Sequence, residues 1–76
     1  MWFVYILRCS DDTLYTGITN NLERRIEQHN KGKGAKYTRG RGPVALVKSF
    51  EVDSKSEALK LEFKIKKLSK EEKLKL

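Results

Sequence analysis

Two short runs rich in aromatic and β-branched residues open the chain, and a polar tetrapeptide separates them. The first run covers Trp2 to Cys9, the second covers Leu14 to Thr19, and Ser10-Asp11-Asp12-Thr13 lies between them. Runs of this length and composition that are bounded by turn-forming residues indicate β-strands joined in a hairpin. The chain is therefore predicted to begin with two antiparallel strands.

This hairpin can bring two tyrosines to the same place. Side chains alternate between the two faces of a strand, so Tyr5 shares a face with Phe3 and Leu7. On the second strand Tyr15 shares a face with Gly17. A glycine in a strand interior often marks a close approach, so we expect Gly17 to admit a backbone or a phosphate where a side chain would collide.

A helix is predicted from about Asn21 to Lys31. Asn20 is a suitable N-cap with Glu23 three residues later, and Gly32 ends the pattern. The residues that repeat at helical spacing on one face are Leu22, Ile26 and His29. The segment from Lys31 to Pro43 then holds four of the five glycines and five Lys or Arg residues, which predicts a basic loop.

The second half of the chain predicts a third strand and a second helix. The strand covers Val44 to Val52, with Pro43 at its start. Its apolar residues at even spacing are Val44, Leu46, Phe50 and Val52. Ser54 and Glu57 form a capping box before a helix whose apolar stripe is Ala58, Leu61, Ile65 and Leu68. Ser69-Lys70-Glu71-Glu72 allows a further short helix at the C-terminus.

The resulting order, β-β-α-β-α, predicts an α+β fold in which helices flank a small antiparallel sheet. With 76 residues there is room for a single domain, residues 1–76, and a chain of this length buries only roughly 60% of its unfolded surface. We therefore expect a thin core and no large substrate cavity.

The charge of the chain favours a polyanionic partner. Seventeen Lys and Arg residues against ten Asp and Glu give a formal net charge of +7, which points to nucleic acid, although excess lysine can also serve solubility alone. Cys9 is the only cysteine, so no intrachain disulfide can form and a reducing cytoplasm is expected. The apolar N-terminal run is too short to span or target a membrane, so no membrane partner is expected.

Arg25 and His29 are four residues apart and therefore lie one above the other on a helix. No acidic residue stands three or four positions from Arg25, so a local ion pair does not account for it. Its guanidinium, which is always charged and donates in a fixed fork, suits a phosphate. A partly buried histidine with a satisfied hydrogen bond is the ordinary interpretation of His29, and the shared face with Arg25 favours a role in a site.

Glu62 lies on the arc of the second helix that should face the core. A carboxylate buried there costs free energy unless it is paired. An ion pair with Lys66, one helical turn away, contributes only about 0.2 to 0.5 kcal/mol. The alternative is a metal ion, because Mg²⁺ is commonly held by one or two carboxylates together with waters and a substrate phosphate.

These residues stand in an order that resembles the GIY-YIG nuclease superfamily. Phe3-Val4-Tyr5 is placed where the first triplet of that family would be, and Tyr15-Thr16-Gly17 is placed where the second would be. The resemblance covers nearly the whole chain and is closest to the small stand-alone YhbQ-like members. It rests on the runs from Tyr15 to Arg25 and from Gln28 to Asn30.

The resemblance implies a three-stranded antiparallel sheet flanked by helices and a single-metal hydrolysis of DNA phosphodiester bonds, in repair or processing. By this resemblance Tyr15 would help to activate water and Tyr5 would orient the water or the scissile phosphate. Arg25 would stabilise the developing charge, His29 would share protons, and Glu62 would hold Mg²⁺ or another divalent cation such as Mn²⁺. Strand propensity alone would also explain either tyrosine.

Contacts to the nucleic acid are expected from a further group of residues. Basic side chains suit phosphates and an aromatic ring suits a base or sugar. The candidates are Arg24, Lys36, Tyr37, Arg39 and Arg41. A partner protein is a further possible source of specificity.

The chain departs from the family pattern at several positions. The first triplet has Phe3 and Val4 where glycine and isoleucine are usual, and the second has Thr16 where isoleucine is usual. Ile18 stands where excision-type members have a lysine, and no asparagine follows Glu62. The alternative functions are therefore a nucleic-acid-binding module without turnover, or an interaction domain that uses the Lys-rich last helix on an acidic protein.

Overall fold

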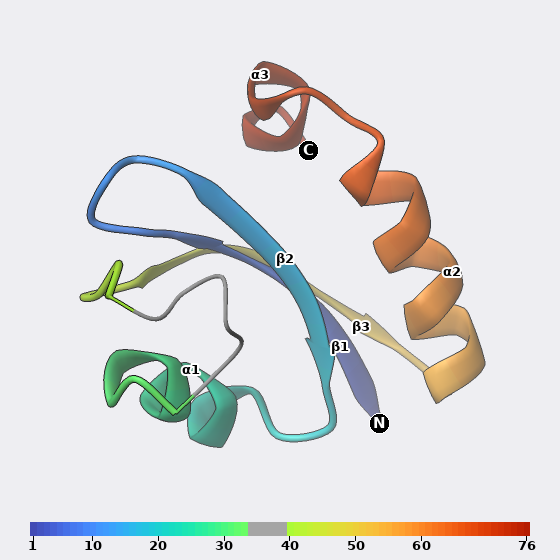
Figure 1. The fold of residues 1–76 in the computed structure, drawn as a ribbon. Helices are drawn as coiled ribbons and strands as arrows, with labels where there is room; N and C mark the ends of the chain where they lie inside the picture. Colours follow the sequence, from blue (N-terminus) through green and yellow to red (C-terminus); the bar gives the residue numbers. More distant parts are fainter. Residues whose placement is uncertain (34–39) are drawn as a thin grey trace.

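The computed structural model describes residues 1–33 and 40–76, and within them the elements follow the order β-β-α-β-α-α (Figure 1). They are β1 (Trp2–Arg8), β2 (Leu14–Thr19), α1 (Leu22–Asn30), β3 (Ala45–Val52), α2 (Lys55–Lys66) and α3 (Lys70–Leu74). The predicted order and the short final helix are confirmed. Within the described ranges, no helix is long and apolar enough to cross a membrane.

The three strands form one antiparallel sheet, as predicted, and their order in the sheet is β2-β1-β3. β1 is the central strand, so β2 and β3 form the two edges. The register of the hairpin places Tyr5 opposite Gly17 and Leu7 opposite Tyr15. Tyr5 and Tyr15 are therefore diagonal neighbours on one face of the sheet, close enough for aromatic side chains to touch.

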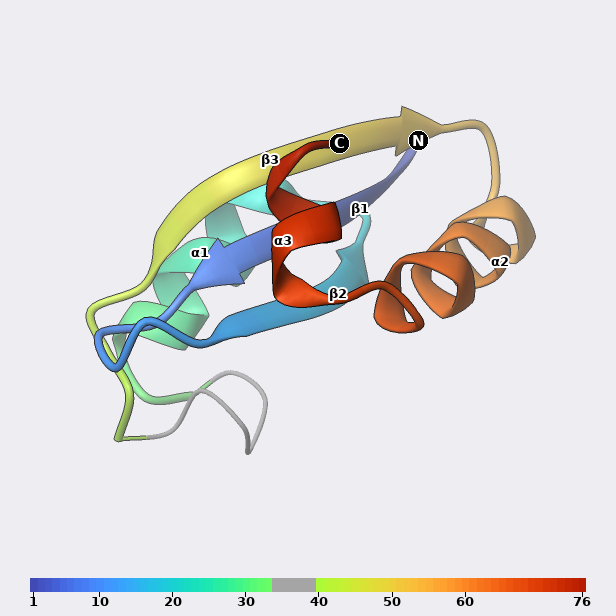
Figure 2. The same ribbon diagram turned by 90° about the horizontal axis from the view of Figure 1, so that it is seen from above.

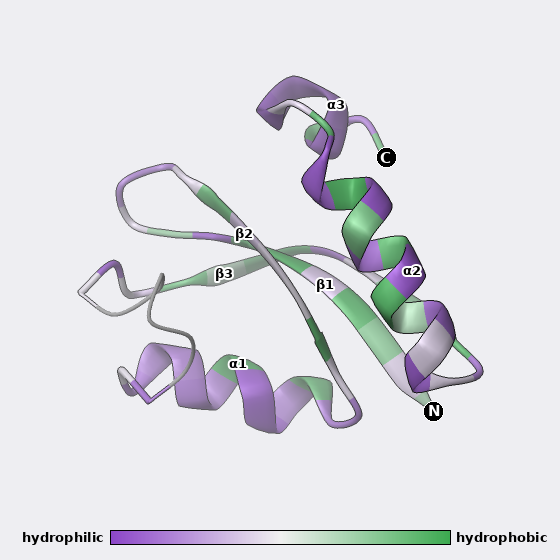
Figure 3. Cartoon of the chain, turned by 45° about the vertical axis from the view of Figure 1, so that its right-hand side comes forward, coloured by the Kyte–Doolittle hydropathy of each residue, from purple (hydrophilic) through white to green (hydrophobic). Residues whose placement is uncertain are grey.

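Helices α1 and α2 cover opposite faces of this sheet (Figure 2). Alternate residues of the central strand serve the two faces, because successive side chains of a strand point in opposite directions. The α2 side buries Val4, Ile6, Ala58 and Ile65, and the α1 side buries Tyr5, Leu7, Cys9 and Val44. The hydropathy colouring shows an apolar β1 between a largely polar α1 and a mixed α2 (Figure 3).

The first helix begins one residue later than the sequence predicts, since its N-cap is Asn21 and not Asn20. Thr19 Oγ1 accepts the backbone N–H of Asn21 at 3.0 Å and holds the turn between β2 and the helix. Asn21 Oδ1 in turn accepts the backbone N–H of Arg24 at 3.2 Å. Asn20 is consequently left exposed between strand and helix, with its side chain available to solvent.

The predicted apolar face of the third strand is wrong at its beginning. The pairing with β1 shifts between Ile6 and Leu7, so that Ile6 is opposite Lys48 whereas Leu7 is opposite Leu46. This β-bulge inserts one extra residue and reverses the alternation. Val47, and not Leu46, therefore packs with Phe50 and Val52 against the α2-side core, while Val44 belongs to the α1 side.

Side-chain caps and a few long-range bonds position the remaining elements. Ser54 caps α2 by accepting the backbone N–H of Glu57 at 3.2 Å, and Ser69 forms a complete capping box with Glu72 in α3. Lys70 joins α3 to the hairpin turn by donating to the Asp12 carboxylate at 2.9 Å. The stripe predicted on α2 is confirmed, since Ala58 and Ile65 are buried and Leu61 and Leu68 are half-buried.

Candidate active site

Tyr5 and His29 form a buried hydrogen-bonded pair between the central strand and α1. Each of these residues is 1% exposed, and Tyr5 Oη lies 3.0 Å from His29 Nε2. The tyrosine comes from the middle of β1, and the histidine comes from the last turn of α1, where the helical stripe of Leu22 and Ile26 carries it toward the sheet. The predicted inward orientation of His29 is confirmed, and the imidazole is satisfied by a phenol.

Tyr15 completes an aromatic group around this pair. Its ring centroid lies 6.3 Å from that of Tyr5 and 5.3 Å from that of His29. Unlike Tyr5, Tyr15 is only half-buried because it lies on the edge strand β2. The hairpin thus brings the two tyrosines together as predicted, and of the two it is Tyr15 that is partly exposed to solvent.

Gly17 makes room for both tyrosines. A Cβ atom at this position would lie 2.6 Å from Tyr5 Oη and 2.8 Å from Tyr5 Cζ, which are distances that real Cβ atoms essentially never adopt, and at a tight 3.0 Å from Tyr15 Cε2. The space where we expected a backbone or a phosphate to approach therefore holds the Tyr5 phenol. Glycine at position 17 is a condition of the Tyr5–His29 hydrogen bond.

The electrostatics of the buried pair keep both groups neutral near pH 7. Burial raises the pKa of the Tyr5 phenol above its usual value of 10.0; Arg25 opposes the rise, and Tyr15 and Glu62 add to it. Burial also lowers the pKa of His29 below 6.5, and the Arg25 guanidinium acts in the same direction. Tyr5 is thus suited to hold a hydrogen bond and unsuited to act as a base.

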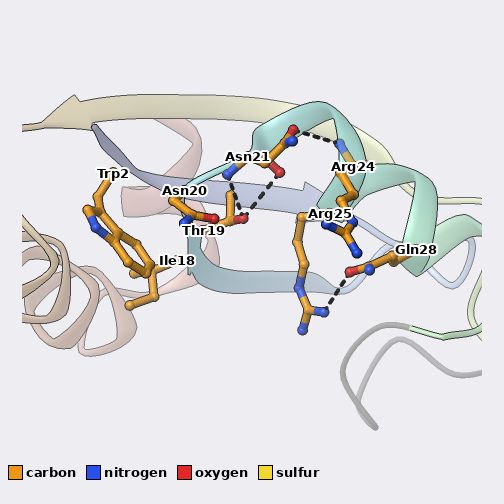
Figure 4. Close-up of a pocket in the computed structure, with 8 residues that line it drawn as sticks. All are labelled: Trp2, Ile18, Thr19, Asn20, Asn21, Arg24, Arg25 and Gln28. Carbon is orange, nitrogen blue, oxygen red and sulfur yellow. Dashed lines mark hydrogen bonds between the residues drawn. The ribbon is translucent and has the colours of Figure 1, made fainter.

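Arg25 lies beside the aromatic group and reaches past the edge of β2. Its side chain is half-buried, and its Nη1 donates to Gln28 Oε1 at 3.1 Å (Figure 4). Its charge influences the pKa of both Tyr5 and His29, so it lies near the pair, as predicted from the shared helical face. Within residues 1–33 and 40–76, no carboxylate forms an ion pair with Arg25.

Glu62 approaches the site from the other side of the sheet. Its side chain is 18% exposed, which agrees with the predicted inward position, and its Oε2 lies 3.3 Å from Lys66 Nζ. The ion pair that the sequence offered as the alternative to a metal ion is therefore present. The carboxylate nevertheless contributes to the raised pKa of Tyr5, so its field reaches the aromatic group.

The α2 side of β2 carries one buried hydroxyl without a hydrogen-bond partner among the described residues. Thr16 lies opposite Ile6 and so on the α2 side, and its buried hydroxyl has no hydrogen-bond partner in the described part of the chain. A buried hydroxyl of this kind ordinarily finds water or an ion. In those same ranges no three His, Cys, Asp or Glu residues gather, so any Mg²⁺ would need water and substrate oxygens besides Glu62.

The expected nucleic-acid contacts are only partly within the described residues. Arg24 is exposed on α1. Arg41 is held at the hairpin turn, where its Nε lies 3.7 Å from Asp11 Oδ2 and its carbonyl accepts the backbone N–H of Ser10. Three further candidates lie outside the described residues: Lys36, Tyr37 and Arg39.

A groove beside the aromatic group contains residues that the sequence did not indicate. Its volume is about 310 Å³, and it runs along the end of β2 and the first turns of α1 (Figure 4). Its lining consists of Trp2, Ile18, Thr19, Asn20, Asn21, Arg24, Arg25 and Gln28. Only Arg24 and Arg25 were predicted. The single tryptophan of the chain is the one signal that could have pointed to the rest.

Comparison with known proteins assigns this chain to a family. Residues 1–75 match the model of the GIY-YIG catalytic domain. UPF0213 protein CPE1444 of Clostridium perfringens is 59% identical over 76 residues, which are all of this chain and 82% of that protein. UPF0213 protein OB0043 of Oceanobacillus iheyensis is 58% identical over 97% of this chain and 86% of its own length.

Solved structures agree with this result. The solution structure of UPF0213 protein BH0048 from Bacillus halodurans is 51% identical and superposes with a TM-score of 0.59, covering 96% of this chain and 79% of that one. The solution structure of protein EF2693 from E. faecalis is 40% identical with a TM-score of 0.65, and the match covers 96% of this chain and 78% of that one. Both likenesses extend over nearly the whole fold described above.

Proposed function

Because this chain belongs to the GIY-YIG nuclease family, among its small stand-alone members, we propose that it is a divalent-metal-dependent endonuclease acting on DNA. Membership in this family implies a nucleic-acid substrate. The observation that carries the proposal is the packed group of Tyr5, Tyr15 and His29 beside Arg25, assembled from two strands and one helix.

The four residues have different parts in the proposed reaction. Tyr15, half-buried at the sheet edge, lies where a water molecule and a phosphodiester have access, so we assign it to orienting and activating that water. Tyr5 remains protonated and buried, so it serves as a positioning residue that holds His29 through the 3.0 Å hydrogen bond. His29, neutral near pH 7, can accept a proton passed from the Tyr15 side.

Arg25 is assigned to the phosphate itself. Its guanidinium has no carboxylate partner in the described ranges and is steadied by Gln28, so its remaining donors are available to non-bridging oxygens. A preorganised cation directed at the charge that develops in the transition state typically contributes several kcal/mol. Arg25 is therefore expected to affect turnover more than binding.

Glu62 is assigned to the metal ion. A single, largely buried carboxylate suits Mg²⁺ or Mn²⁺, which retain waters and take substrate oxygens as further ligands. When bound, such an ion neutralises phosphate charge and lowers the pKa of coordinated water. Lys66 occupies the carboxylate in the protein alone, so we expect the metal to compete with that ion pair.

The decisive test is nicking of supercoiled plasmid DNA by the purified protein with Mg²⁺, with Mn²⁺ and with EDTA. We expect cleavage with either cation and none with EDTA. Arg25→Ala and Glu62→Gln should each lower the rate at least 100-fold, in line with the loss of one charge-stabilising group. Binding of the same DNA should remain measurable and should weaken steeply with salt, because contacts to phosphates release counterions.

Matched variants at other positions control for the general effect of losing one charge. Arg8→Ala and Glu71→Gln make the same chemical changes at exposed positions on β1 and α3 and should retain the wild-type rate. Equal nicking by the wild-type protein and both site variants would contradict the proposal.

The alternative of a binding module without turnover has one observation in its favour, the engagement of Glu62 by Lys66. In that case the protein would bind DNA with the same salt dependence and leave it intact with every cation. The nicking experiment therefore separates the two functions.

A further inference from the structure

Besides Arg25, the groove next to the aromatic group is lined by side chains that the proposed hydrolysis does not use. One end is formed by the indole of Trp2, with Ile18 next to it, and the other end is formed by Arg25 and Gln28 (Figure 4). The side chain of Asn20, which is exposed after the corrected helix start, lines the groove between them. An aromatic ring, an amide and a guanidinium group thus lie one after another along the groove.

The size of this groove limits what can occupy it. A volume of about 310 Å³ lies at the lower end of the roughly 300 to 1,000 Å³ that is usual for ligand pockets. A hollow of this size is suited to one nucleotide, and a base can enter it only when it is unpaired or turned out of its pair.

The charges around the groove favour a nucleotide over a neutral ligand. Arg24 and Arg25 lie at one end, and Lys55 Nζ lies 5.5 Å from the centroid of the Trp2 ring at the other. An aromatic ring flanked by cations is the usual arrangement for holding a single nucleic-acid strand, in which a base stacks and the phosphates are neutralised.

We propose that this groove binds one unpaired nucleotide of the DNA strand, with its base against Trp2 and its phosphate at Arg25. Because Arg25 is assigned to the phosphate that is cleaved, the phosphate of this nucleotide would be the scissile one, and its base would lie in the groove beside the cut. Asn20 supplies amide groups for the edge of the base. The preferred substrate would then be a strand that is single or locally opened, which adds to the proposed function and rests on it.

The chain offers a direct reporter, because Trp2 is its only tryptophan. The fluorescence of the native protein is titrated in EDTA with a short single-stranded oligodeoxynucleotide, with an oligomer of equal length that lacks bases, and with a free nucleoside monophosphate. We expect the oligodeoxynucleotide to quench the emission, the oligomer without bases to bind and leave it nearly unchanged, and the monophosphate to act only at much higher concentration.

Three results of this titration would overturn the inference. One is binding of the oligodeoxynucleotide, followed by anisotropy of a label on the DNA, without any change in Trp2 emission. Another is equal quenching by the oligomer without bases, since stacking would then have no part. Saturation by the free monophosphate at the same concentration would indicate a site for free nucleotides and would also contradict a strand site.

Variants test the groove without relying on one residue. Trp2→Leu should weaken single-strand binding about fivefold or more, as expected for the loss of one base–aromatic stack. Since Trp2 also packs against the α2-side core, Asn20→Asp gives a second test at an exposed position. It should weaken binding severalfold, whereas Lys75→Gln, which lowers the net charge equally on the exposed C-terminus, should change it much less. Equal effects of these two variants would exclude a local role for Asn20.

The proposal for the groove and the proposed nuclease function can be disproved independently of each other. If plasmid DNA is nicked and Trp2 emission does not respond to bases, the groove is not a nucleotide site and the proposed function stands. If Trp2 emission responds to bases and no DNA is cleaved under any condition, the groove stands and the proposed function fails.

Discussion

The two faces of the sheet are built from different kinds of side chain. Toward α2, the buried residues Val4, Ile6, Ala58 and Ile65 are all aliphatic. Toward α1, Tyr5 and His29 are as deeply buried as any aliphatic residue, and they join Leu7, Cys9 and Val44. One strand, β1, supplies both faces through the alternation of its side chains.

This difference between the two faces indicates that the α2 face mainly stabilises the fold, while the α1 face holds the polar groups of the candidate active site. Burial of aliphatic groups is favourable wherever they pack, and it needs no specific partner. A buried phenol and imidazole need hydrogen-bond partners, so the α1 face depends on specific contacts such as the one between Tyr5 Oη and His29 Nε2. In a thin core, the α2 face therefore supports the geometry that the α1 face uses.

The largest effect is expected from removing a buried side chain on the α2 face. Ile65→Ala should lower the free energy of unfolding by about 2 to 5 kcal/mol, because Ile65 is 2% exposed and its truncation leaves a cavity. Urea unfolding followed by circular dichroism measures this loss. Leu59→Ala on the same helix, at a residue 47% exposed, should be nearly neutral. A similar loss of stability in both variants would contradict the conclusion that the buried aliphatic side chains on the α2 face stabilise the fold.

A smaller loss of stability with a larger loss of function is expected on the α1 face. Gly17→Ala should cost about 1 to 3 kcal/mol, since its Cβ would meet Tyr5 Oη at 2.6 Å and must displace the phenol from His29. Nicking should fall more than the residual folded fraction explains. Gly42→Ala is the control, because among residues 1–33 and 40–76 a Cβ there meets only the Asn30 backbone oxygen, at 4.0 Å. Unchanged stability in Gly17→Ala would mean that Tyr5 can move without cost.

The smallest effect should appear in the pH dependence of stability. Burial and Arg25 lower the pKa of His29, the only histidine. The imidazole of the unfolded chain therefore binds a proton near pH 6.5, whereas in the folded protein it does so only at a lower pH. The stabilising contribution is therefore complete above pH 6.5 and is lost as the pH falls through and below that value. Urea midpoints between pH 7.5 and 5.5 should decline in the wild type and stay level in His29→Gln. Parallel declines would assign the effect to other groups.

Much of this fold could be predicted because its signals are local. The hairpin, the two main helices, the cap at Ser54 and the short last helix after Ser69 follow from alternation, helical spacing and turn residues within short stretches. The inward positions of His29 and Glu62 were also visible as members of apolar stripes. Family resemblance supplied the roles assigned to these residues, which the proposed experiments test.

The errors of prediction arose where one segment depends on another. Val47 replaces Leu46 in the α2-side core because a bulge against β1 shifts the register, and a single strand cannot reveal its partner's register. The first helix begins after Asn21 because Thr19 holds the turn that precedes it. Each change is small, yet the second one leaves Asn20 free to line the groove.

The sequence alone determined which residue types were available and on which face of each element they lie, because strand and helix periodicity are properties of neighbouring residues. Only the tertiary structure decided how those faces meet. Residues 24 positions apart form the Tyr5–His29 hydrogen bond, and Trp2 and Arg25 come to share one groove. Such distances depend on sheet register and helix docking, which are set by the packing of the whole chain.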